Sequence, residues 1–88
     1  MVELKVSSKS NPNAVAGAIA GGIKDHETIS IKVVGAGALN QAVKAVTIAR
    51  GFVVPLGFDL IIVPHFIDIE LNEVEKTGLK LVIKKVHA

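Results

Sequence analysis

Alternating hydrophobic and polar residues predict two strands in the first half of the chain. Within residues 2–7, every second side chain is apolar, beginning with Val2. The pattern recurs in residues 28–34 through Ile29, Ile31 and Val33. A period of two is typical of a strand with one buried and one exposed face. Both segments are therefore expected in a sheet, with these three side chains directed into the core.

A longer strand is predicted over residues 60–71. Its odd-numbered and even-numbered positions lie on opposite faces, and we expect Leu60, Ile62 and Phe66 on the face turned away from the helices. Pro64 cannot donate a hydrogen bond to a neighbouring strand. It therefore favours a position at the edge of the sheet or a local bulge.

A turn and a final strand complete the predicted sheet. Residues 72–77 are expected to form the turn, and residues 79–83 alternate again and return as the last strand. With a turn of this length, Lys80 would lie across from Asp68 or Glu70. Such a cross-strand ion pair would stabilise the sheet by about 0.2–1 kcal/mol.

The segment between the first two strands has the signals of a helix. Asn11 before Pro12 is typical of an N-cap followed by proline at the first helical position. Glycine inside a helix is costly, so Gly21 and Gly22 indicate either close approach of another backbone or fraying of the helix end. Helical spacing predicts a buried face of Val15, Ile19 and Ile23.

A second helix is predicted from the turn at Gly35 and Gly37 to a C-terminal cap at Gly51. Three- and four-residue spacing predicts its buried face, which comprises Leu39, Ala42, Val43, Val46 and Ala49. The outward face then carries Gln41, Lys44, Ala45 and Ile48.

Apolar residues on this outward face and in the loop that follows predict self-association. A monomer rarely exposes a contiguous apolar patch, and a two-fold axis would bury it against a second copy. We therefore expect a homo-oligomer, either a dimer or a tetramer. Its predicted interface comprises Gln41, Ile48, Phe52, Val54 and Leu56.

Taken together, these elements predict an α+β fold in a single domain that spans residues 1–88. The order β-α-β-α-β-β is expected to form a two-layer sandwich, with two helices on one face of a four-stranded mixed sheet. The other face of the sheet would stay open.

Composition narrows the class of protein. The 88 residues carry ten Lys or Arg and eight Asp or Glu, which gives a formal charge of +2. A small positive charge is compatible with a polyanionic partner. The absence of cysteine favours a reducing compartment, and no apolar run reaches the length of a membrane span. A cytoplasmic protein without membrane contact is expected.

Two loops contain candidate phosphate contacts. Gly35 and Gly37 would expose backbone N–H groups at the start of the second helix; tight helix–sheet packing is the alternative. The loop after the first strand combines a cation with hydrogen-bonding side chains, and simple helix capping is the alternative there. Candidate nucleic-acid contacts are Lys9, Ser10, Asn11, Asn13, Gly37, Asn40 and Lys44.

Catalytic and metal-binding patterns are missing from the sequence. His26, His65 and His87 are scattered without the spacing of metal ligands. The carboxylates of the last hairpin, including Glu73 and Glu75, are interpreted as a solvated tip. We therefore expect no catalytic residue, no metal, no cofactor and no small-molecule substrate.

Three long segments of the chain carry a family resemblance: VSSKSNPNAVAGAIAG, GAGALNQAVKAVTIARGFVVPLGFDL and PHFIDI. They resemble the stage V sporulation protein S family, which is similar in fold to Alba-type nucleic-acid-binding proteins. The resemblance implies a cytosolic, self-associating regulator of sporulation that binds nucleic acid without catalysis. Lys9 stands where Alba-type proteins place phosphate-binding lysines, and Asn11 and Asn13 continue that motif.

Two parts of the chain depart from the Alba pattern. Alba-type proteins are rich in arginine at the turn into the second helix, where this chain has Gly35, Gly37 and Gln41. Glu73 and Glu75 in the last hairpin would repel phosphate. The alternative hypothesis is therefore a protein–protein assembly module in spore formation that has no direct contact with nucleic acid.

Overall fold

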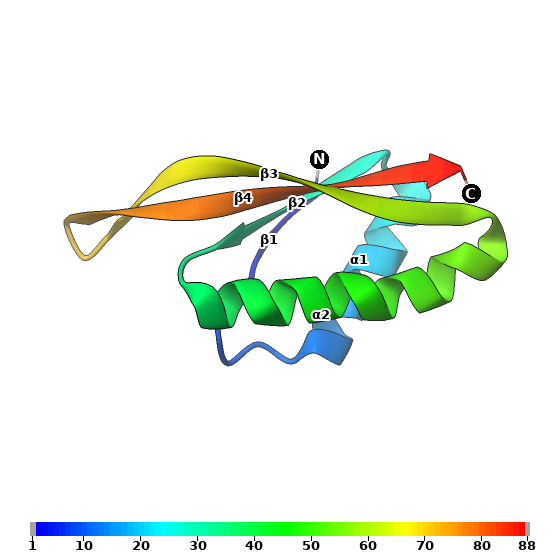
Figure 1. Cartoon of the computed structure of the whole chain (residues 1–88), viewed down its shortest axis with the longest axis horizontal. Coiled ribbons are helices and arrows are strands. Elements are labelled where there is room, and N and C mark those ends of the chain that lie inside the picture. The colour runs from blue at the N-terminus through cyan, green and yellow to red at the C-terminus, as the bar shows by residue number, and fades with distance from the viewer. Residues whose placement is uncertain (1, 88) are drawn as a thin grey trace.

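The computed structural model describes residues 2–87 and contains one mixed sheet covered on one face by two helices (Figure 1). The strands lie in the order β1-β2-β4-β3, with β1 parallel to β2 and the other neighbours antiparallel. This arrangement confirms the predicted α+β fold and places β3 at an edge, as Pro64 indicated. The elements are β1 (Val2–Lys5), α1 (Pro12–Asp25), β2 (Thr28–Val33), α2 (Ala36–Val53), the 3-10 helix η1 (Val54–Leu56), β3 (Phe58–Leu71) and β4 (Val74–His87).

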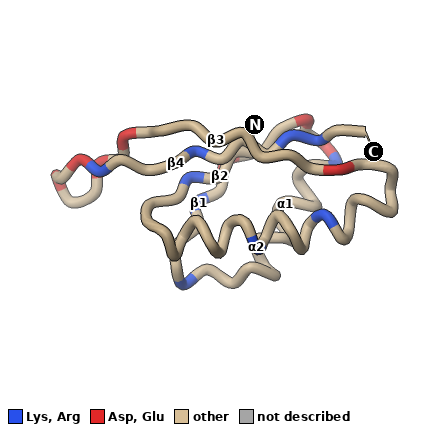
Figure 2. The backbone as a smooth tube through the Cα atoms, in the orientation of Figure 1, with Lys and Arg blue, Asp and Glu red and all other residues tan. Residues whose placement is uncertain are grey.

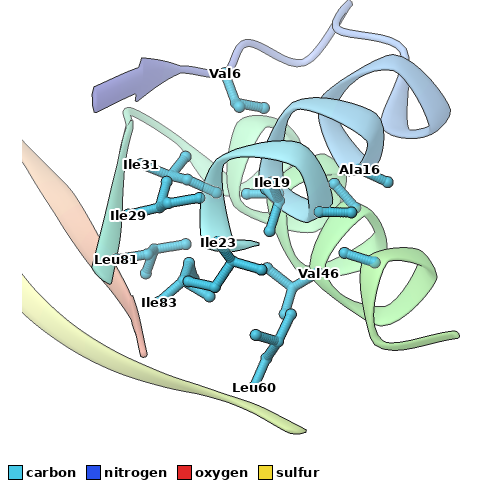
Figure 3. Packing of buried hydrophobic residues seen from close by; sticks show 14 of the residues in the cluster. Val6, Ala16, Ile19, Ile23, Ile29, Ile31, Val46, Leu60, Leu81 and Ile83 are labelled. Atoms are coloured by element: carbon cyan, nitrogen blue, oxygen red, sulfur yellow. The ribbon is translucent and has the colours of Figure 1, made fainter. Parts of the chain in front are cut away.

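The core lies between the helices and the two central strands (Figure 3). Ile19 and Ile23 of α1 pack onto the predicted inward residues of β2, and α2 contributes mostly small side chains. Each fully buried isoleucine stabilises the fold by about 1.5–3 kcal/mol. The largest fully buried side chains include Ile19, Ile23, Ile29, Ile31, Leu81 and Ile83.

Helix α1 begins at the predicted cap. The Asn11 side chain accepts hydrogen bonds from the backbone N–H groups of Asn13 and Ala14, and Pro12 follows it. The helix continues through its glycines to Asp25, so fraying is wrong. At Gly22 an added Cβ would lie 2.9 Å from Ile29 Cδ1. A side chain of β2, and not the expected backbone, therefore lies close to that glycine.

Helix α2 differs from the prediction in its end and in its buried face. It continues through Gly51 to Val53, and the left-handed residue that ends the turn is Gly57, with φ of 93° after η1. Ala45 is fully buried, whereas Val43 is 42% exposed. The helix contacts α1 as well as the sheet, so more than one side of it is buried.

The face assignment of β3 was wrong. Leu60 is only 6% exposed and belongs to the core, and Ile62 packs against that core. Phe66 shares their side of the strand and lies near Leu39 of α2. The odd-numbered residues of β3 therefore lie on the open face. Aliphatic residues occupy both faces of this strand, so alternation alone did not identify the buried one.

The predicted six-residue turn is also wrong. The strands β3 and β4 are joined by a turn at Asn72 and Glu73, whose φ angles are 52° and 63°. Two successive positive φ values are typical of the tight turns that match the twist of a hairpin. The shorter turn shifts the register, so Lys80 pairs with His65 and does not oppose Asp68 or Glu70.

Candidate nucleic-acid interface

The loop between β1 and α1 is held by its own serines. Ser7 N–H donates to Ser10 Oγ at 2.9 Å, and Lys9 N–H donates to Ser7 Oγ at 3.2 Å. A backbone hydrogen bond from Ser10 N–H to Ser7 O closes the same turn. Lys9 itself is exposed. The loop thus presents a cation from an ordered backbone.

This loop lies against the first turns of α2. Gln41 Nε2 donates to the carbonyl oxygen of Ser10 at 2.9 Å. A Cβ at Gly37 would lie 2.9 Å from Ser8 Cβ, so glycine permits the contact. The structure therefore brings together two predicted site segments that are 31 residues apart along the chain. Gln41, which we predicted at the oligomer interface, bonds within its own chain.

The backbone N–H groups at the start of α2 suit the binding of an anion. Its N-cap is Gly35, which makes no side-chain capping bond, and no acidic residue lies in the first turn. The first N–H groups of a helix lack intrahelical partners and carry partial positive charge. Asn40 and Lys44 are exposed on the following turns. Phosphate contact would thus meet both N–H groups and side chains here.

Of the other residues predicted to contact nucleic acid, some hold the local backbone and others are exposed. Asn11 Oδ1 is used in capping α1, while Asn13 is exposed at the start of the same helix. Ser10 is half-buried, and its hydroxyl and carbonyl oxygens both accept hydrogen bonds. Lys9 is thus the exposed cation of this loop.

The ion pairs of the structure involve cations other than the lysines of the candidate interface. Within residues 2–87 the pairs are Lys32 with Glu3 at 3.0 Å, Arg50 with Asp59 at 2.6 Å and Lys85 with Glu27 at 3.8 Å. None of them involves Lys9 or Lys44. Figure 2 shows acidic positions gathered toward the free end of the β3–β4 hairpin, away from the β1–α1 loop.

The apolar residues predicted at the oligomer interface divide into two groups. Phe52, Val54 and Leu56 are 60%, 42% and 57% exposed at the end of α2 and in η1. Ile48 is only partly exposed, because it packs against the core. The outward orientation predicted for Ile48 is therefore wrong in part, and the exposed apolar surface lies further along the chain.

Phe66 is an exposed apolar residue that the predicted interface omitted. It is 82% exposed and lines a cleft of about 260 Å³ on the helix side of the hairpin, with Leu39 and Leu79. Val43 is also exposed. Val43 was omitted because it was assigned to the buried face of α2. Phe66 was expected on the open face of the sheet, and the register of the hairpin places it on the helix side.

Neither a metal-binding cluster nor a membrane-spanning helix occurs in the described part of the chain. Among residues 2–87, no group of three or more His, Asp or Glu side chains is placed to hold a metal ion. Over the same residues, no helix has the length and apolar character needed to cross a membrane.

Comparison with known proteins agrees with this geometry. A family model described as stage V sporulation protein S (SpoVS) matches residues 2–86. Among solved structures, Alba from Thermoplasma volcanium has a TM-score of 0.65 and 16% sequence identity, over 97% of this chain and 99% of that one. The second likeness establishes an Alba-like fold.

Proposed function

We propose, from the premise that the chain belongs to the stage V sporulation protein S family, that it is a non-enzymatic cytoplasmic regulator of sporulation. In this proposal it acts as a homo-oligomer that binds nucleic acid. The family membership supports the sporulation role, and the resemblance to Alba-type nucleic-acid-binding proteins supports the ligand.

The loop between β1 and α1, which carries Lys9, is called the Lys9 loop below. Its attachment to the start of α2 is the observation that carries the proposal. The 2.9 Å bond from Gln41 to Ser10 fixes the loop beside N–H groups that no side chain caps. Phosphate oxygens accept from backbone N–H groups and pair with lysine. Neither group reads base identity, so binding is expected to be largely independent of sequence.

Self-association would strengthen this weak single contact. One exposed lysine per loop supplies few phosphate contacts, and a symmetric dimer doubles them. The exposed side chains of Phe52 and Leu56, at the end of α2 and in η1, and of Phe66 on β3 are apolar positions that a second copy would cover.

The experiment is a salt titration of binding to two duplexes of unrelated sequence and to one single strand. Neutralised phosphates release counterions, so log K falls linearly with log salt, by about 0.9 per phosphate on duplex DNA. We expect similar slopes for both duplexes. Absence of binding at low salt contradicts the proposal.

A protein–protein assembly module is the second candidate. Phe66 at 82% exposure favours it, since a large apolar side chain in that position calls for a cover. An oligomer that forms stably but binds no nucleic acid at low salt supports this alternative.

A further inference from the structure

A row of basic side chains crosses the open face of the sheet. Lys5 of β1 pairs with Lys32 of β2, Lys32 pairs with Lys80 of β4, and Lys80 pairs with His65 of β3. Each of the four strands thus contributes one side chain to a line across the sheet. Lys5, Lys32, Lys80 and His65 are called the lysine row below. Lys84 lies on the same face, because it is separated from Lys80 by four positions of an alternating strand.

Close placement of like charges is unfavourable for the free protein. Neighbouring strands are about 4.8 Å apart, so the backbones of Lys5 and Lys80 are separated by about 10 Å. Like charges directly opposite each other destabilise a sheet. Glu3 offsets part of this repulsion through its 3.0 Å bond to Lys32. That bond lowers the pKa of Glu3, and Lys80 and Lys5 add to the effect.

The carboxylates of the hairpin lie mainly on the other side. Glu70 pairs with Glu75, and the even-numbered residues of β3 share the side of Leu60, which faces the helices. The open side of the hairpin carries Ile69 paired with Lys76. An anion on the open face would therefore meet lysines, with the strand backbones between it and this glutamate pair.

A cleft connects the row with the β1–α1 loop. It encloses about 590 Å³ beside the hairpin, and Lys5 and Lys32 of the row line it together with Lys76. Ser7 and Ser8 form the part of its wall that leads to the Lys9 loop, and Asp68 is its one acidic residue. The remaining lining residues are aliphatic: Val6, Val34, Ile69 and Leu71.

We propose that this lysine row is a second contact surface for the phosphate backbone of nucleic acid, continuous with the Lys9 loop through the cleft. This inference rests on the proposed function. Lys5, Lys32 and Lys80 lie side by side, and of these only Lys32 is paired with a carboxylate, that of Glu3. Charge complementarity therefore favours a polyanion as the partner of this surface. Apart from His65 at its end, the row contains no ring on which a base could stack, so its lysines contact backbone phosphates.

The test removes two charges that flank the Lys32–Glu3 pair while that pair stays intact. The variant Lys5→Gln with Lys80→Gln is titrated with salt on a duplex of defined sequence. We expect the slope of log K on log salt to fall by about two units, since each phosphate contact contributes about 0.9. Its melting temperature should be equal to or higher than that of the wild type, because a like-charge repulsion has been removed.

Two matched variants separate the possible causes. Lys24→Glu changes the net charge by the same two units at the exposed end of α1, and its slope should stay close to the wild-type value. An equal fall in this control would assign the effect to net charge and contradict the inference. Lys9→Ala tests the loop separately.

The remaining outcomes are distinguishable. If the double variant keeps the wild-type slope while Lys9→Ala lowers it, the proposed function stands and the lysine row is not part of it. If the wild type binds neither duplex nor single strand at low salt, both proposals are wrong. A change in sedimentation of the double variant without nucleic acid would make the face an interface between copies, which also contradicts the inference.

Discussion

Gln41 Nε2 donates a hydrogen bond of 2.9 Å to the backbone carbonyl of Ser10, and this bond joins the two segments of the candidate interface. Both residues are partly buried. A part-buried carbonyl without its partner remains poorly solvated, so this contact affects both the stability of the protein and the position of the loop.

Gln41→Ala tests the role of that bond. Loss of one such hydrogen bond should lower the free energy of unfolding by about 0.5–1.5 kcal/mol and weaken nucleic-acid binding through a less ordered loop. Chemical denaturation and binding at fixed salt measure the two effects. The stability control is Asn40→Ala, which changes an exposed neighbour. Equal stability of the two variants would show that the tether is not a stabilising contact.

Gly78→Ala should be strongly destabilising. A Cβ there would lie 2.7 Å from the carbonyl oxygen of Val33 and 3.0 Å from Ile69 Cδ1. Overpacking of this kind costs about 1–3 kcal/mol, which thermal or urea unfolding would detect. Gly21→Ala is the matched control, because nothing lies within 4 Å of its added Cβ. That helical substitution should stabilise by up to about 1 kcal/mol.

The ion pair between Arg50 and Asp59 predicts a pH effect on stability. The Arg50 guanidinium, followed by the backbone N–H of Leu60, lowers the pKa of Asp59 below its ordinary 3.8. The folded state then binds a proton less readily than the unfolded state, so the stabilisation is present above pH 3.8 and is lost as pH falls further. Asp59→Asn should flatten this part of the curve of unfolding midpoint against pH. An unchanged curve would assign the acid sensitivity to other carboxylates, such as Glu3.

Phe66→Glu tests self-association at the hairpin. The side chain is 82% exposed, so the charge should not disturb the core, yet it would oppose burial against a second copy. We expect sedimentation to show a monomer. Thr47→Glu adds the same charge on an exposed part of α2 and serves as the control, which should keep the wild-type oligomeric state. A Phe66→Glu protein that keeps the wild-type oligomeric state would exclude this residue from the interface.

Much of the fold follows from local signals in the sequence. The Asn11–Pro12 cap and the inward residues Ile29 and Ile31 were predictable, because each depends on neighbours along the chain. Pro64 limited its strand to an edge or a local bulge, and β3 lies at an edge. These signals fix the element order, and the structure agrees with it.

Features that depend on register or on rotation could not be predicted. Both faces of β3 are aliphatic, so only packing identifies Leu60 as buried. The turn at Asn72 and Glu73 lacks glycine, which concealed its length. Lys80 joins the lysine row through two registers: the β3–β4 turn pairs it with His65, and the pairing of β2 with β4 places it beside Lys32. The sequence therefore indicates the Lys9 loop but not the lysine row.

The most direct measurement of the central claim is the salt slope of duplex binding for Lys9→Ala beside the wild type. Lys9 is exposed, so the substitution should shift stability by no more than about 0.5 kcal/mol. We expect weaker binding to unrelated sequences alike, with the slope lowered by about 0.9 for each phosphate that the variant no longer neutralises. An unchanged affinity and slope, with the fold intact, would contradict phosphate binding by this loop.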